Sequence, residues 1–191
     1  MKVVAFNGSP RKGGNTQIAL ETVLKPLQDA GIETEIIQVG GSGIKPCTAC
    51  YWCRKEMKGR CVMDDDALNG WLQKMIEADA IIIGSPTYFA ELTPETKALI
   101  DRAGFAGRGI EGSFKRKVGS AIAINRRAGA MKVLEGINKF FLINDMFVAG
   151  STYWNMAFGM DKGEVVNDEE GMQTFENLGN NILWFLQNVK K

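Results

Sequence analysis

Four cysteines occupy one short stretch of this sequence, and thiols gathered in this way can ligate a metal centre. They are Cys47, Cys50, Cys53 and Cys61, in the pattern C-x2-C-x2-C-x7-C. The first three can occupy three corners of a [4Fe–4S] cube, and the fourth follows after a short loop. Three alternatives stay open: a zinc site, whose cysteines usually come as two separated pairs, disulfides, or a metal-free loop at a dimer contact.

The sequence contains no histidine. This excludes the Ser-His-Asp triad, the Cys-His dyad and histidine acid–base chemistry. Any reaction must therefore rest on a cofactor, or on carboxylates, lysines, thiols and backbone groups. The aspartates at 64–66 could be offered as a magnesium site, but capping of a helix that follows them is the simpler explanation.

The segment from Asn7 to Thr16 combines glycines with hydrogen-bond donors and cations. Glycines let the backbone approach an anion closely, and a helix beginning directly afterwards would aim free N–H groups at the same point. An ordinary glycine-rich turn is the alternative. A P-loop does not fit, because Gly13 is followed by Gly14 and Asn15 where Lys and Ser or Thr are needed, and the glycine spacing from Gly8 does not give the dinucleotide pattern G-x-G-x-x-G. The segment predicts a phosphate site made by Ser9, Arg11, Lys12, Gly14, Asn15 and Thr16.

Two further loops could hold a planar heterocycle. In the loop that begins at Gly84, Pro86, Thr87, Tyr88 and Phe89 would offer a stiff backbone edge and an apolar wall. The alternative is that both aromatics are core residues, but adjacent side chains seldom both point inward. In the next such loop, Asn125 and Arg126 could place a polar or cationic group beside the ring; a solvated basic turn is the alternative.

The elements that would position these loops alternate along the chain. Short apolar runs predict strands at 2–6, 33–39, 80–84, 118–124 and 147–152, and helical patterns predict helices at 16–30, 67–78, 94–103, 130–142 and 171–189. Asn15 and Thr93 are the expected N-caps of the first and third helices. Residues 40–65 form a cysteine-containing loop, and 156–168 a polar excursion.

Strict alternation of this kind indicates an α/β fold. We expect one domain over residues 1–191, with a doubly wound five-stranded parallel sheet of order 2-1-3-4-5 and helices on both faces, as in flavodoxin. Ligands of such sheets bind outside the carboxyl ends of the strands, which is where the three loops lie. Because the cysteine loop also leaves a strand at this edge, we expect the thiols there too.

Composition is that of an average globular protein. The 191 residues are 45% hydrophobic and 24% charged, with a net charge of +1. Neither nucleic acid nor an anionic membrane surface is favoured by this charge, and no apolar run approaches the roughly 18 residues of a membrane-spanning helix. The sequence starts directly with a strand pattern, so we expect a cytoplasmic protein.

The motifs G-S-P-R-K-G-G-N-T and G-S-P-T-Y-F resemble the NADPH-dependent FMN reductase branch of the flavodoxin-like superfamily, and the resemblance covers nearly the whole chain. It implies FMN as cofactor, with the 5′-phosphate on the first loop and the isoalloxazine ring on the second. It also implies a homodimer or homotetramer in which a neighbouring subunit often completes the flavin site.

The cysteine pattern is similar to that of the iron–sulfur flavoprotein subfamily, whose compact motif carries a [4Fe–4S] cluster; the seven-residue gap is at the long end of that pattern. The resemblance implies an FMN-dependent oxidoreductase with no catalytic side chain. Electrons would pass from a donor such as ferredoxin or NAD(P)H to a quinone, O2 or peroxide. A cluster-free NAD(P)H:FMN or NAD(P)H:quinone oxidoreductase is one alternative, and a non-catalytic binding domain on the same fold is another.

Overall fold

The computed structural model describes residues 1–189, and its centre is a parallel β-sheet. The strands lie in the order β2-β1-β3-β4-β5, and β6 also pairs with β4. Every pairing is parallel. The bounds are β1 Lys2–Asn7, β2 Glu33–Gln38, β3 Ala80–Pro86, β4 Val118–Asn125, β5 Phe147–Val148 and β6 Met156–Phe158. The expected α/β fold and strand order are confirmed.

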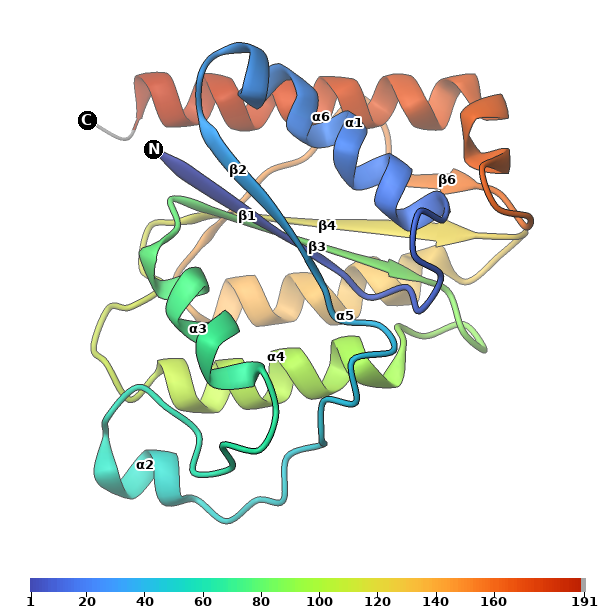
Figure 1. Cartoon of the computed structure of the whole chain (residues 1–191). Helices are drawn as coiled ribbons and strands as arrows, with labels where there is room; N and C mark the ends of the chain where they lie inside the picture. Colours follow the sequence, from blue (N-terminus) through green and yellow to red (C-terminus); the bar gives the residue numbers. More distant parts are fainter. Residues whose placement is uncertain (190–191) are drawn as a thin grey trace.

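Helices cover both faces of this sheet (Figure 1). Helices α1 (Asn15–Asp29) and α6 (Glu169–Asn188) lie on one face, and α3 (Leu68–Glu77), α4 (Pro94–Gly107) and α5 (Ala130–Ile143) lie on the other. Successive residues of β1 divide between the two cores, because side chains alternate along a strand. Val3 and Ala5 pack under α1 and α6, whereas Val4 and Phe6 pack under α3 to α5.

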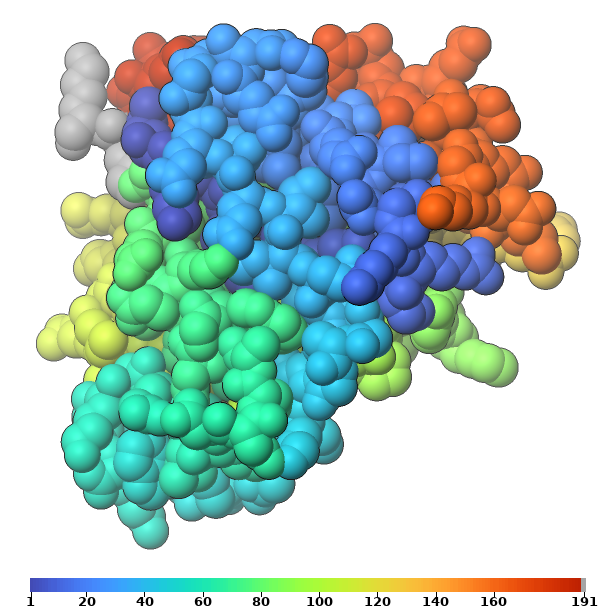
Figure 2. Space-filling model, in the orientation of Figure 1, coloured from blue at the N-terminus to red at the C-terminus, as the bar shows by residue number. Residues whose placement is uncertain are grey.

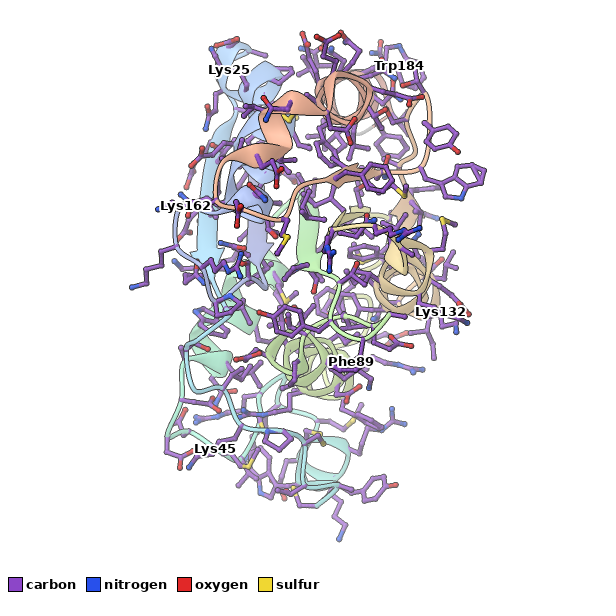
Figure 3. All side chains as sticks on the ribbon, turned by 90° about the vertical axis from the view of Figure 1, so that its right-hand side faces the viewer. Lys25, Lys45, Phe89, Lys132, Lys162 and Trp184 are labelled. Atoms are coloured by element: carbon purple, nitrogen blue, oxygen red, sulfur yellow. The ribbon has the colours of Figure 1, made fainter. Side chains whose placement is uncertain are left out.

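The carboxyl ends of the strands meet at one edge of the sheet, on the right of Figure 1. The loops after β1, β3 and β4 therefore lie side by side, and Figure 3 views the molecule from this edge. No helix within residues 1–189 combines the length and apolar character that crossing a bilayer requires.

The far edge of the sheet differs from the sequence-based expectation. A continuous last strand over 147–152 is wrong: β5 ends at Val148, and the polar excursion contains β6 and a short 3-10 helix, η1 (Glu164–Asn167). The Ser120 hydroxyl donates to the Ala149 carbonyl, and the Ser151 hydroxyl donates to the Thr174 carbonyl. The first bond keeps Ala149 beside β4, and the second directs the chain toward α6, so the ladder is interrupted and β4 is paired at its two ends by different segments.

The cysteine-containing loop also has structure of its own. It includes a short helix, α2 (Trp52–Glu56), that the sequence did not predict. Helix α3 begins at Leu68 and has no acidic residue in its first turn, so the expected shared capping role of residues 64–66 is wrong for two of the three. The N-cap position is Ala67, which has no capping side chain; Asp66, just before it, accepts from the Leu68 N–H at 3.1 Å, while Asp64 and Asp65 pair with Arg60 and Lys45 on the surface.

Asp66 also forms a buried ion pair with Arg102 of α4. The side chains are 6% and 0% exposed, respectively. A second bond to Asp66 comes from the Lys45 N–H, at 3.1 Å. The pair thus ties both ends of the cysteine-containing loop to α4.

We expect Asp66→Asn to lower the free energy of unfolding by about 3–5 kcal/mol at neutral pH, because the buried guanidinium of Arg102 loses its anion. Burial raises the pKa of Asp66, but hydrogen bonds from Arg102 and from two backbone N–H groups outweigh it and hold the pKa below its ordinary value. The stabilisation is therefore present above the ordinary pKa of about 4 and is lost as pH falls through the lower folded-state pKa.

Urea unfolding across this pH range measures the effect, and the difference between wild type and variant should shrink in acid. Asp65→Asn is the matched control, since its exposed carboxylate pairs only with Lys45 and should matter far less. Equal losses in the two variants would contradict the prediction.

Candidate functional site

The loop between β1 and α1 lies tightly against the neighbouring loop. The Gly8 N–H donates to the Gly84 carbonyl at 2.7 Å, and the Thr93 hydroxyl donates to the Gly8 carbonyl at 2.9 Å. A Cβ atom at Gly8 would lie 1.9 Å from the Thr96 hydroxyl oxygen, so only glycine fits here. The close contact brings the first and second loops together.

Side chains of the sheet hold the first loop from below. The Asn7 amide donates to Gln38 at 2.8 Å, and the Gln38 amide donates to the Ser9 carbonyl at 2.6 Å. The Ser9 N–H donates to Asn7 Oδ1 at 3.0 Å. These bonds fix the loop backbone before any ligand is bound.

Helix α1 starts at the end of this loop without a side-chain cap. Its N-cap is Gly14, which has no side chain to accept from the first-turn N–H groups. Such a helix end favours an anion, through the free N–H groups and the helix dipole. Ser9 and Thr16 are buried beside it.

The expectation that Asn15 caps this helix is wrong, because Asn15 is its first helical residue. Its side chain bonds a distant segment instead: Nδ2 donates to the Asp161 carbonyl at 2.8 Å, and Oδ1 accepts from the Gly163 N–H at 2.8 Å. The Arg11 guanidinium similarly donates to the Met160 carbonyl at 3.0 Å. Both residues hold the segment 159–163 against the first loop, and their predicted role with phosphate stays a prediction.

Lys162 is a cation at this site that the sequence analysis missed. A Cβ atom built on Gly13 would lie 3.2 Å from its Nζ atom, so the ammonium group stands beside the first loop (Figure 3). Nothing in the local sequence of the polar excursion indicates this contact. Only the hydrogen bonds of Asn15 reveal this contact, because they hold Asp161 and Gly163, the neighbours of Lys162, beside the first loop from almost 150 positions away in the chain.

The second loop makes a tight turn after β3. Tyr88 and Glu91 exchange backbone hydrogen bonds of 2.8 and 3.0 Å. Phe89 and Ala90, at the tip, have left-handed φ angles of 48° and 62°. Phe89 is fully exposed there (Figure 3). Tyr88 lines the cleft described below.

The third loop contributes buried polar atoms without partners. Asn125, the last residue of β4, is 3% exposed, and neither its Oδ1 nor its Nδ2 has a hydrogen-bond partner among the described residues. In the second loop, the Thr87 hydroxyl oxygen is likewise buried and has no hydrogen-bond partner among the described residues. Leaving a buried polar group unsatisfied costs about 1–3 kcal/mol. These atoms are therefore the places at which a bound ligand is expected to form hydrogen bonds.

One cleft of about 180 Å³ joins the three loops and the 159–162 segment. It is lined by Ser9, Arg11, Asn15, Thr16, Pro86, Thr87, Tyr88, Ile124, Arg126, Gly159, Met160 and Lys162. Four residues predicted from the sequence lie outside this lining. Lys12 and Phe89 are exposed, whereas Gly14 and Asn125 are buried next to lining residues.

The four cysteines line a second, smaller cavity of about 50 Å³ together with Arg102 and Phe105. All four are free thiols; Cys47 and Cys50 are exposed, and Cys53 and Cys61 are half-buried. Burial raises the pKa of the Cys53 thiol, and so do the neighbouring thiols of Cys61, Cys50 and Cys47. The segment therefore gathers its sulfur atoms around one point, although they are spread along the sequence.

Left-handed backbone makes this gathering possible. Ala49, Tyr51 and Met57 have φ angles of 53°, 58° and 49°. Each costs about 1–2 kcal/mol in a residue with a Cβ atom. Strain of this kind persists where the surroundings impose it, commonly at functional sites. The Tyr51 ring packs edge-on against Phe105 of α4, with 6.3 Å between centroids, and holds one of these turns.

Four thiolates can in principle ligate either an iron–sulfur cluster or a single zinc ion, and the two need different spacings of the sulfur atoms. Within residues 1–189, no three Cys, Asp or Glu side chains are close enough to share one metal ion. Zinc would need its sulfur ligands within about 4 Å of one another, given Zn–S bonds of about 2.3 Å. A cubane binds each thiolate at a different iron, so its ligands stand further apart.

The cysteine cavity and the cleft lie at different ends of α4. The second loop ends at Thr93, the confirmed N-cap of this helix, whereas the cavity borders Arg102 and Phe105. From Thr93 to Arg102 the helix rises about 14 Å, at about 1.5 Å per residue. The expectation that the thiols stay at the edge with the cleft is therefore wrong within one chain. Figures 1 and 2 show the cysteine segment at the lower left, away from that edge.

This parallel sheet, with its cleft at the carboxyl edge, defines a flavodoxin-like α/β protein. Solved structures agree: a flavone reductase superposes with a TM-score of 0.74 at 19% identity, covering 100% of this chain and 64% of that one. An archaeal flavodoxin gives 0.65 at 16% identity, covering 98% and 100%.

Residues 1–161 match the family described as NADPH-dependent FMN reductase, and the chain belongs to this family. It is 36% identical to an iron-sulfur flavoprotein of Methanocaldococcus jannaschii, over 100% of both chains. It is also 31% identical to an iron-sulfur flavoprotein of Methanosarcina thermophila, over 100% of this chain and 98% of that one. The protein is thus an FMN-dependent oxidoreductase.

We expect Lys162→Met to weaken FMN binding by about tenfold at low salt, because it removes a cation beside the first loop. Fluorescence titration of the apoprotein with FMN measures the change. Lys12→Met is the matched control: it removes an exposed lysine of the same loop that does not line the cleft. A larger loss for Lys12→Met would show that the phosphate lies on the outer side of the loop.

Proposed function

We propose that the chain holds FMN in the cleft at the carboxyl edge and a [4Fe–4S] cluster on Cys47, Cys50, Cys53 and Cys61, and that it passes electrons between the two centres. The observation that carries the flavin half is a set of buried polar atoms without hydrogen-bond partners at this edge: the Thr87 hydroxyl and the two side-chain amide atoms of Asn125. Within residues 1–189, Asn125 is the one residue with two such side-chain atoms.

The phosphate would bind where α1 begins. The uncapped first turn supplies N–H donors, and the buried Ser9 and Thr16 hydroxyls lie alongside. Lys162 and Arg11 supply positive charge, while Asn15 keeps the 159–163 segment in place. An anion here gains charge-assisted hydrogen bonds without reorganisation of the loop.

The ring would lie along Pro86, Thr87 and Tyr88. The backbone of this loop is held by the Ser85 hydroxyl, which accepts from the Thr93 N–H at 3.0 Å. Asn125 would bond the polar rim of the ring, and the Arg126 guanidinium lines the cleft where it could stabilise negative charge. FMN, when bound, supplies the hydride and electron-transfer chemistry; the residues of the chain bind it, orient it and set its surroundings.

Support for the cluster comes from the gathered thiols and from the names of relatives. Four free cysteines line one cavity, and residues with left-handed backbone lie between them in the chain. The relatives from Methanocaldococcus jannaschii and Methanosarcina thermophila are both called iron-sulfur flavoproteins. Four reduced thiols also suit a reducing compartment, so we keep the cytoplasm as the expected location.

Separation of the two sites along α4 favours a homo-oligomer. Because cleft and cysteine cavity are at different ends of that helix, the cluster of one copy would serve the flavin of another. A homodimer or homotetramer would provide this contact. The external partners would be an electron donor, ferredoxin or NAD(P)H, and an acceptor such as a quinone, O2 or peroxide.

We expect Cys50→Ala to abolish iron–sulfur absorbance and bound iron while FMN stays bound, since the thiol lies outside the flavin cleft. Anaerobic purification followed by absorbance spectroscopy and iron and sulfide analysis measures both. Wild-type protein with full flavin, NADPH turnover and no iron would favour a cluster-free NAD(P)H:FMN or quinone oxidoreductase instead.

Asn125→Leu should have opposite effects on the apoprotein and on binding. It removes two unsatisfied buried atoms, so the apoprotein should be at least as stable, whereas FMN affinity should fall by about tenfold or more. Urea unfolding without FMN and FMN titration give the two quantities. Asn144→Leu is the control: Asn144 is also buried, with an unpartnered Oδ1, but lies at the end of α5 and outside the cleft. An unchanged FMN affinity in Asn125→Leu would place the ring elsewhere.

A further inference from the structure

Arg102 is a buried arginine that contacts one of the four cysteines. Its side chain is 0% exposed, and it lies on α4. The Nη2 group donates to the Cys61 Sγ atom at 3.5 Å and to the Met63 carbonyl at 3.2 Å. The Nη1 group donates to the Lys45 carbonyl at 3.1 Å and pairs with Asp66.

These contacts surround the cysteine segment on both sides. Lys45 is two residues before Cys47, and Met63 is two residues after Cys61. A single guanidinium therefore fixes the entry and the exit of the segment, and it gives Cys61 a charged hydrogen-bond donor. A planar group with five N–H donors can do this, whereas a lysine ammonium cannot bridge the same set.

One N–H donor of Arg102 has no hydrogen-bond acceptor among the described residues. Its Nε atom is buried and has no hydrogen-bond partner among residues 1–189. Arg102 also lines the cavity that the four cysteines share. An acceptor sulfur held in this cavity would satisfy the Nε–H group, as FMN would satisfy Asn125 in the cleft.

We propose that Arg102 is a positioning residue for the cluster: it fixes Cys61 as a ligand and raises the reduction potential of the bound cluster. This rests on the proposed [4Fe–4S] cluster. Hydrogen bonds to ligand sulfur and nearby positive charge stabilise the reduced cluster, which carries one more negative charge. Asp66 opposes the charge effect, because its carboxylate partly neutralises the guanidinium.

The test is a redox titration of anaerobically purified protein with FMN and cluster bound, following the cluster by electron paramagnetic resonance. Arg102→Gln and Arg102→Lys should both shift the cluster to a more negative potential, with the smaller shift for lysine, which keeps the charge. Asp66→Asn should shift it in the opposite direction. The flavin potential in the same titration should stay unchanged.

Arg108→Gln is the matched control, since Arg108 is an exposed arginine at the end of the same helix and outside the cysteine cavity. A purely structural role would leave the potential of the loaded fraction unchanged in every variant. Unchanged potentials in both Arg102 variants, with iron bound, would overturn this inference alone. Wild-type protein that takes up no iron would overturn the cluster proposal and this inference together.

Discussion

The contact of Gly8 with the loop after β3 is the constraint on which the cleft depends. Gly8 donates to the Gly84 carbonyl and accepts from the Thr93 hydroxyl, and a Cβ atom would collide with Thr96. Thr93 is also the N-cap of α4, so one threonine ends the second loop, starts a helix and fixes the first loop. Without this close approach, the first and second loops would not line one cleft. The cleft is thus built by backbone proximity, and side chains refine it.

Helix α4 connects the two loops at the cleft to the cysteine segment. Its first residue follows Thr93, and its Arg102 holds the segment that carries the four thiols. A rigid helix therefore sets the relation between the two candidate redox sites and keeps them apart within a chain. Under the proposed function, electron transfer between these sites would depend on how copies of the chain assemble. Changes in the α4 surface would then affect function without touching either site.

The sequence predicted those features of the fold that depend on local pattern. The buried strands are continuous apolar runs, and their alternation with helices leaves few topologies, so the sheet order and the three converging loops were predictable. The split of β5 from β6 was not, because it depends on hydroxyl groups of Ser120 and Ser151 bonding distant carbonyls. Lys162 and the bonds of Asn15 to the 159–163 segment were missed for the same reason: the residues that meet there are almost 150 positions apart in the chain. Long-range pairing of polar side chains leaves no periodic trace in the sequence.

Both candidate sites are places where the folded chain carries unsatisfied or strained groups. Asn125 and Thr87 have buried polar atoms without partners, Arg102 has an unused buried donor, and Ala49 and Tyr51 adopt left-handed backbone. Each of these features costs free energy that the core must offset. Similar features also occur elsewhere, at the side-chain oxygens of Asn138, Asn144 and Asn155 and in the left-handed backbone of Arg116 and Asp145, but Asn125 is the one residue within 1–189 with two such side-chain atoms. Ligands that bind the folded state and satisfy these groups would recover part of that cost and stabilise the fold through linkage. If both proposed groups bind, we expect the apoprotein to be less stable than the loaded protein, because these buried donors and acceptors are satisfied only in the loaded state.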